Sequence, residues 1–483
     1  MFDGRLPPAL AASTALLAAA LAGCALGPDY QRPASQLDAT FVNAGASANN
    51  TQPPSADIAT FWRAFNDARL SALIERALAV NGDIRIAQSR LQEARANRGE
   101  ADAAALPSLG VESGVTRSVM PITQQPGTSR SQRTGTSYDA SFIANWELDF
   151  FGRYRRGSEA AAALVDASEA GLHAAHTTIA AEVARNYLAL RGLQQRQKVT
   201  EAELLNQRES LRITDARLDA GRGTQLDLAR ARALVASTEA SLPVLQSQVE
   251  RAVFRLATLS AQSPRALLAE LSVPEPLPSL PVTDLGALPV GTPEQWLQRR
   301  PDIVAAERQL AAATASIGVA KTDMFPRISL SGLLGLNAAK FSDLDKNDSV
   351  IYSLGVGLRW TPFDFGAIRS RVKASQARAE GSLANYEQTV ATALEETEGA
   401  FSGYTRNAQR AEHLLTATTS AQEAAQLARL RFDSGVTDFL TVLDAEREVL
   451  SNRDQWVQAQ TDTATSLVSV YRALGGGWAA PAE

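Results

Sequence analysis

Two related stretches, NWELDFFGRYR at 145–155 and RWTPFDFGAIR at 359–369, decide how this chain is organised. They lie 214 residues apart, an offset that also joins ARLDAGRGTQLDLARA (216–231) to LRFDSGVTDFLTVLDA (430–445). Upstream, Pro107 matches Pro326 at an offset of 219, so the first copy holds five extra residues before its tryptophan. A repeat of this kind predicts two structurally equivalent halves.

The repeat defines the expected domains of the 483-residue chain. Each copy predicts a helix, two strands, a very long helix, a tight turn and a returning helix. The first copy spans 61–272, with a β-hairpin at about 107–150 and helices at about 154–260 around a tip at 221–224. The second spans 294–475, with a β-hairpin at about 326–364 and helices at about 367–474 around a tip at 435–438. The remaining parts are an extended segment at 24–60, a connector with six prolines at 273–293 and a tail at 476–483.

The N-terminus has the pattern of a secretory signal. Residues 9–23 are apolar and rich in alanine and leucine, a run too short to span a bilayer comfortably. The next residue, Cys24, is the only cysteine in the chain. LAGC at 21–24 resembles a bacterial lipobox, which implies removal of residues 1–23 and lipid attachment to Cys24. The alternative is a plain signal peptide with an incidental cysteine. Ala25 resembles the residue that sorts such lipoproteins to the outer membrane.

Composition and motifs argue against nucleic-acid binding and against catalysis. The net charge is -5, and no run is rich in lysine or arginine, so no nucleic-acid partner is expected. His173 and His176 could share a helix face, but the sequence places no third ligand near them. No nucleophile-elbow, P-loop or dinucleotide fingerprint occurs in a suitable context. We therefore expect no enzyme activity, no metal site and no cofactor beyond the lipid on Cys24.

The expected strands alternate between apolar and polar residues. In 138–150, apolar residues at every second position alternate with Asp139, Ser141, Asn145 and other residues. In 350–360 the same pattern runs to Trp360, and partner strands are expected at 108–119 and 327–337. A period of two with one apolar face is what a transmembrane barrel strand needs. A soluble, half-buried hairpin is the alternative for either copy taken alone.

Four strands are too few to close a barrel, which needs about eight. Open strand edges are not tolerated in lipid, because their backbone groups would lack hydrogen bonds. Copies of the chain must therefore pool strands if they form a transmembrane barrel. A trimer would supply twelve strands and a dimer eight, and strand counting alone leaves both open.

The helical stretch from about 154 to 220 contains no proline and would extend roughly 100 Å. Its apolar residues recur every seven positions, which predicts left-handed coiled-coil contacts. The heptad positions are Val183, Leu190, Gln197, Leu204, Leu211 and Leu218. Flanking positions such as Gln194 are expected on broad polar faces, as in a ring of helices around water. Pro243 predicts a kink in the returning helix.

The two turns are expected to be the free tips of helical hairpins. Their residues are Gly221, Arg222 and Gly223 in the first copy and Gly435, Val436 and Thr437 in the second. Glycine after a long helix favours a left-handed stop. Thr224 followed by Asp227 then resembles a capping box.

Four further motifs resemble one family. GPDYQRP after Cys24, RRPDIVAAERQL (299–310), GVTDFLTVLDAERE (435–448) and YRALGGGW (471–478) resemble the TolC-like outer-membrane efflux factors, in the lipoprotein branch typified by OprM and NodT. The resemblance implies a mixed fold, mainly α, in which a homotrimer forms a 12-strand transmembrane β-barrel continuous with a 12-helix periplasmic α-barrel. It also implies a periplasmic adaptor, an inner-membrane pump often of the resistance-nodulation-division class, and a cargo of drugs and small amphiphiles.

The same resemblance places a gate at the periplasmic tips, where the hairpin tips would also contact the adaptor. Carried onto this sequence, the gate residues are Leu440 and Asp444, with Arg447 nearby. Three chains would supply a leucine ring, which can dewet, and a carboxylate ring, which attracts cations. Arg230 occupies the first-copy position that matches Asp444. The hypothesis is that either Arg230 or Arg447 holds Asp444 in the closed state; an ordinary solvated carboxylate is the alternative.

The sequence is compatible with two other functions. One is the same channel serving a type I protein secretion system, which changes the cargo class. The other is a structural lipoprotein, a coiled-coil strut without a pore. The alternating strands argue against the strut. The neighbouring genes would separate the two cargo classes.

Overall fold

The two repeats interleave instead of folding as separate halves. The computed structural model describes residues 25–34, 38, 40–43, 56–281 and 292–478. One compact unit, here called the sheet unit, combines the described residues of 1–33 with 91–168 and 306–386. The other, the tip unit, combines the described residues of 34–90, 169–305 and 387–483. Each unit therefore contains segments of both repeats.

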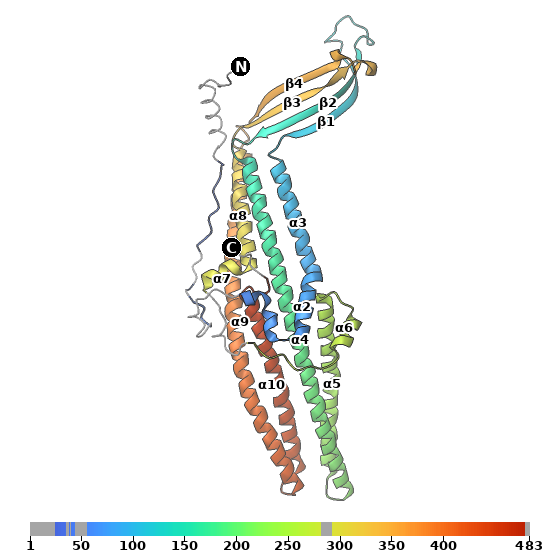
Figure 1. Ribbon diagram of the computed structural model, residues 1–483, viewed down its shortest axis with the longest axis vertical. Coiled ribbons are helices and arrows are strands. Elements are labelled where there is room, and N and C mark those ends of the chain that lie inside the picture. Colours follow the sequence, from blue (N-terminus) through green and yellow to red (C-terminus); the bar gives the residue numbers. More distant parts are fainter. Residues whose placement is uncertain (1–24, 35–37, 39, 44–55, 282–291, 479–483) are drawn as a thin grey trace, which may run out of the picture. The chain divides into compact units, whose positions relative to one another are not determined.

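The sheet unit contains one antiparallel sheet of four strands in the order β1-β2-β3-β4 (Figure 1). The strands are β1 (Ser108–Val119), β2 (Thr134–Leu148), β3 (Arg327–Ala338) and β4 (Val350–Arg359). Short 3-10 helices η4 (Phe341–Asp343) and η5 (Asn347–Ser349) lie in the loop before β4. The repeats meet where β2 pairs with β3, with Asn145 opposite Ser331.

One face of the sheet is apolar and exposed. Val111, Phe142, Leu334 and Tyr352 form a row across all four strands by direct cross-strand pairing. Their exposed fractions are 70%, 58%, 58% and 83%. An apolar patch of this kind on the surface of a single chain marks a face made for lipid or for another protein.

Four helices belong wholly or in part to the sheet unit. They are α3 (Gly82–Ala103), α4 (Arg153–Asp219), α8 (Pro301–Thr322) and α9 (Ala367–Asp433). The N-terminal strap, residues 25–33, is bound to two of them. Arg156 of α4 donates to Asp29 at 2.6 Å and to the Leu26 carbonyl at 3.1 Å. Tyr30 donates to Glu307 of α8 at 3.1 Å, and Arg32 pairs with the same carboxylate. The strap therefore joins two of the sequence motifs, GPDYQRP and RRPDIVAAERQL.

The segment expected to be extended over 24–60 is helical from Ala56, which corrects that boundary. The 3-10 helix η2 spans Ala56–Phe65. Ile58, Phe61, Trp62 and Phe65 are buried, and their spacing places them on one helical face. Burial of this apolar face stabilises the helix in its packed position.

The single helix expected before the first hairpin is divided in two. α2 (Ala68–Val80) ends at Asn81, and α3 begins directly after it. The Asn81 side chain accepts from the backbone N–H of Asp83 at 2.8 Å and donates to the Leu259 carbonyl at 2.9 Å. This asparagine competes with the helical hydrogen bonds and starts the second helix.

The returning helices are α5 (Gln225–Leu259) and α10 (Phe439–Ala473). α5 continues through Pro243. Two short helices, α6 (Pro264–Leu271) and α7 (Pro293–Arg299), flank the connector, of which 282–291 lie outside the described residues. Along the searched part of the chain, no helix combines the length and apolarity needed to cross a membrane.

The seam on α4 is wider and more polar than the heptad pattern indicates, which corrects a second expectation. Gln194, expected on a solvated face, is 2% exposed and donates to the Leu271 carbonyl at 2.7 Å. Further along the helix, buried polar side chains recur at helical spacing. They are Glu203, Gln207, Ser210 and Thr214. Neighbouring helices therefore enclose more of α4 than a two-stranded coiled coil would.

Candidate channel gate at the helical tips

Both helical hairpins turn by the same backbone device. Gly221 and Gly435 have φ values of +68° and +72°, a conformation that glycine adopts without steric cost. After α4, the Arg222 N–H donates to the Arg217 carbonyl at 2.8 Å; after α9, the Val436 N–H donates to the Arg431 carbonyl at 2.9 Å. These bonds complete a Schellman motif at the end of each helix. The left-handed stop expected from the sequence is confirmed at both tips.

A capping side chain then begins the returning helix of each hairpin. The Thr224 hydroxyl accepts from the Asp227 N–H at 3.1 Å, and the Asp438 carboxylate accepts from the Thr441 N–H at 3.1 Å. The capping box expected at Thr224 is only half formed. The Asp227 carboxylate accepts from the Thr224 hydroxyl at 2.6 Å instead of binding a backbone N–H. Hydrogen bonds from Thr441 lower the pKa of Asp438, so it stays ionised at the positive end of α10.

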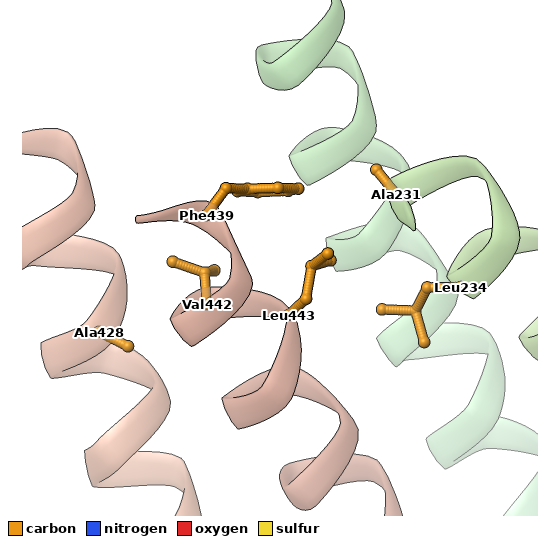
Figure 2. Packing of buried hydrophobic residues seen from close by; sticks show 6 residues of the cluster. All are labelled: Ala231, Leu234, Ala428, Phe439, Val442 and Leu443. Atoms are coloured by element: carbon orange, nitrogen blue, oxygen red, sulfur yellow. The ribbon is translucent and has the colours of Figure 1, made fainter. Parts of the chain in front are cut away.

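An apolar cluster holds the two hairpins together near their tips (Figure 2). Its members come from α5, α9 and α10. They are Ala231, Leu234, Ala428, Phe439, Val442 and Leu443. Phe432 packs against this cluster, with its ring centroid 5.2 Å from that of Phe439. Because the cluster contains residues of both repeats, it couples the position of one tip to that of the other.

The predicted gate residues lie on the face of α10 that this cluster leaves uncovered. Leu440 is 36% exposed, and the side chains of Asp444 and Arg447 are each 59% exposed. Arg447 Nη1 lies 3.6 Å from Asp444 Oδ1, one helical turn away. Phe439, Val442 and Leu443 point to the buried side of the same helix (Figure 2). α10 therefore separates a packing face from a face that presents leucine, carboxylate and guanidinium.

Of the two arginines considered as partners of Asp444, the structure brings only Arg447 into an ion pair among the described residues. Arg230 is half-buried on α5, and its positive charge acts on Asp438. Arg230 is the repeat equivalent of Asp444. In the structure its charge acts on Asp438, the N-cap residue of α10.

Two features of the tips were missed from the sequence. Arg217 lies with its guanidinium carbon 3.9 Å from the centre of the Phe432 ring, and its Nη2 lies 3.8 Å from Asp433. Ser210 donates to buried Glu446 at 2.7 Å. In each case the partners come from different repeats, so no spacing within one repeat could identify them. The only sequence signal is a polar residue at a helical position expected to face a neighbour.

The other predicted site residues are distributed as follows. At the tips, Arg222 and Val436 are exposed, while Gly223 and Thr437 are half-buried. Cys24 and the signal segment lie outside the described residues. His173 stacks on Trp478, with ring centroids 4.2 Å apart, and burial lowers its pKa. Within the searched part of the chain, no group of three or more His, Cys, Asp or Glu side chains could hold a metal ion.

The structure thus contains a sheet with an exposed apolar face and paired helical hairpins. Near the hairpin tips, one face of α10 presents Leu440, Asp444 and Arg447. The exposed apolar face marks a surface for lipid or for another protein. Three comparisons with known proteins give the class of protein. The family model described as "Outer membrane efflux protein" matches residues 73–262 and 292–476. OprJ, an outer membrane protein of Pseudomonas aeruginosa, is 33% identical over 473 residues, which cover 98% of this chain and 96% of OprJ.

Solved structures extend the comparison to the fold. The structure of the outer-membrane channel OprN matches with a TM-score of 0.87 and 40% identity, and covers 95% of this chain and 100% of that one. The open state of the MtrE channel of Neisseria gonorrhoeae matches with a TM-score of 0.81 and 28% identity, over 94% and 99% of the two chains. The chain belongs to the outer membrane efflux protein family. It is accordingly an outer-membrane protein, and the family resemblance inferred from the sequence is confirmed.

Proposed function

We propose that this chain is the outer-membrane channel of a tripartite efflux system and works as a homotrimer. Three copies of the sheet would supply a barrel of twelve strands. Three copies of α4, α5, α9 and α10 would supply a tunnel of twelve helices. The observation that carries the proposal is the exposed apolar row from Val111 to Tyr352, which would face lipid in such a barrel.

The proposed cargo consists of drugs and other small amphiphiles, received from a periplasmic adaptor and an inner-membrane pump of the resistance-nodulation-division class. Relatives named for a solvent efflux pump (30% identical) and a cation efflux system (30% identical) support small-molecule export. A lipid on Cys24 would be an accessory tether. The exposed tip residues Arg222 and Val436 would contact the adaptor.

The gate would be formed where three α10 helices present Leu440 and Asp444 to a common axis. A leucine ring is a constriction that can exclude water, and three carboxylates favour cations over anions. The Arg447 guanidinium, 3.6 Å from Asp444, partly neutralises that ring. Because both side chains are exposed, their attraction is weak, about 0.2–1 kcal/mol, and the gate would open at low cost.

Conductance in planar bilayers tests this gate. We expect Asp444→Ala to raise the conductance of the purified trimer and to lower its preference for cations. Arg447→Ala should increase the preference for cations, because it leaves the carboxylate ring unneutralised. Glu250→Ala is the matched control, since Glu250 is an exposed carboxylate of α5 about 37 Å from the tip. If conductance and selectivity match the parent in both gate variants, the gate assignment is wrong.

A further inference from the structure

Residues related by the two sequence offsets make equivalent contacts in the structure. In the first hairpin Glu112 pairs with Ser141, and in the second Ser331 pairs with Gly355. Adding 219 to Glu112 and 214 to Ser141 gives this second pair. Side-chain contacts follow the same rule. Trp146 Nε1 donates to the Ala105 carbonyl at 2.9 Å, and its counterpart Trp360 donates to the Met324 carbonyl at 3.1 Å.

The strand pairing between the repeats inside the chain therefore predicts an equivalent strand pairing between chains. Inside the chain, β2 of the first repeat pairs with β3 of the second. The equivalent partners at the outer edges are β4 and β1, each of which has a single neighbour in the described sheet. They lie on opposite edges, about 14 Å apart by strand spacing, so β4 can meet β1 only in another copy. A strand edge in lipid must be paired.

We infer that β4 of one copy pairs antiparallel with β1 of the next, in the register that sets Arg359 opposite Glu112. The internal pair Asn145 and Ser331 fixes this register. Adding 214 to Asn145 gives Arg359, and subtracting 219 from Ser331 gives Glu112. The inference rests on the proposed trimer and specifies the strand contacts that would close it.

The side chains at this junction are complementary. The internal pair is neutral, but its counterpart joins a guanidinium to a carboxylate. Glu112 and Arg359 are both exposed, and the structure shows neither in an ion pair with another described residue. Within the chain, Arg359 lies opposite another arginine, Arg327, whose charge is paired with Asp323. A carboxylate from the next copy would supply the missing opposite charge.

The other face of the junction continues the apolar row. The same register sets Val356 opposite Val115, the equivalents of Phe142 and Leu334. Val356 and Val115 are 73% and 65% exposed in the single chain. A register slip of one residue would turn every side chain to the opposite face, so this match is specific.

A third contact lies just beyond the strands. Phe151 stacks on Phe325 inside the chain, with ring centroids 4.8 Å apart. The offsets carry this pair to Phe365 and Leu106. Phe365 is fully exposed and has a φ of +53°, and Leu106 is 65% exposed. The Leu106 side chain of the next copy would cover Phe365, as Phe325 covers Phe151.

Cysteine cross-linking in outer-membrane fractions tests the register. In the proposed register Leu358 lies opposite Ser113, so the double variant Ser113→Cys with Leu358→Cys should give covalent dimers and trimers on oxidation, all reversed by reductant. The matched controls pair Leu358→Cys with Val111→Cys or Val115→Cys. These positions lie on the same face, displaced by two residues, and their separation of about 7–8 Å is too large for a disulfide.

A charge exchange gives a second, independent readout. Glu112→Arg and Arg359→Glu alone should each lower the temperature at which trimers dissociate on semi-native gels. The double exchange should restore it, because the pair is regained with reversed polarity. Cross-linking only in a displaced control, or a double exchange no better than the singles, would overturn the register while leaving the trimer intact. Monomers by native mass spectrometry, with no cross-link in any variant, would overturn the trimer and the proposed channel with it.

Discussion

Ser210 on α4 donates a hydrogen bond of 2.7 Å to Oε1 of Glu446 on α10, and the second carboxylate oxygen of Glu446 is buried without a partner in the described structure. Burial raises the pKa of Glu446, against the opposing influence of the Ser210 hydrogen bond and of Arg429. Burial also raises the pKa of Glu203 on α4, and the charge of Glu446 adds to that effect. Two carboxyl groups thus share a poorly solvated seam between helices of different repeats.

This relationship predicts a pH-dependent stability of the helical tips. A carboxyl group whose pKa is raised by folding binds its proton more tightly in the folded state. Its contribution to stability is therefore present at low pH and lost as pH rises from about 4.5 through the raised value. Glu446→Gln keeps an acceptor for Ser210 and removes the buried charge. We expect it to stabilise the protein at pH 7.5 by on the order of 1 kcal/mol, and by less at pH 5.

Thermal unfolding followed by circular dichroism at pH 5 and pH 7.5 measures this effect. Glu448→Gln is the control, because Glu448 is an exposed carboxylate on the same helix. The unfolding temperature of Glu448→Gln should differ from that of the parent protein by the same amount at both pH values. If Glu446→Gln behaved in the same way, the buried carboxyl group would not be the source of the pH dependence.

Arg217 is predicted to fasten the end of α4 to the end of α9. Its guanidinium lies over the Phe432 ring and near Asp433. Arg217→Ala should cost about 1 kcal/mol and increase hydrogen exchange in both tips. Arg212→Ala is the matched control, because Arg212 pairs with Glu209 on its own helix at 2.7 Å. An increase in hydrogen exchange confined to the first tip would show that the contact does not couple the two hairpins.

Gly192 is predicted to be required for the close approach of α4 and α10. A Cβ atom at this position would lie 2.1 Å from the Thr461 hydroxyl oxygen. Gly192→Ala should therefore destabilise the tip unit by about 1–3 kcal/mol. Gly171→Ala on the same helix has open space at its Cβ and should stabilise by about 0.5–1 kcal/mol. Opposite signs in thermal unfolding would support the packing account, and equal effects would contradict it.

Glu307 is predicted to anchor the N-terminal strap. It is 2% exposed and accepts from both Tyr30 and Arg32. Glu307→Gln removes the charge that pairs with Arg32 and should cost about 1–3 kcal/mol. Limited proteolysis should then cut the strap faster, while Glu100→Gln, on an exposed face of α3, should leave the rate unchanged. An unaltered rate in Glu307→Gln would show that other contacts hold the strap.

The sequence predicted the elements that depend on local pattern. Alternation identified the strands, the absence of proline over 154–220 identified a helix of the length that α4 has, and Gly221 and Gly435 identified the turns. The family was also recognisable from short motifs. Local signals suffice for these features because strand pleat, helix period and left-handed glycine are properties of neighbouring residues.

Sequence patterns did not predict the features that depend on contacts between residues far apart in the chain. The polar seam of Gln207, Ser210 and Glu446 resembles an ordinary solvated helix face until a second helix covers it. Asn81 interrupts a helix because its side chain reaches the Leu259 carbonyl, 178 residues away. Arg230 matches Asp444 in the repeat, but in the structure its charge acts on Asp438, an interaction that the sequence did not indicate.

The repeat and its two offsets are evident in the amino-acid sequence, and they indicate the kinds of element in each half. The interleaving of the halves, with β2 beside β3 and the two tips joined by one apolar cluster, depends on packing between distant residues. The halves interleave because the elements of a single repeat cannot cover one another. A two-stranded hairpin leaves its strand edges unpaired, and an isolated pair of helices leaves apolar stripes exposed. Residues far away in the chain must cover both.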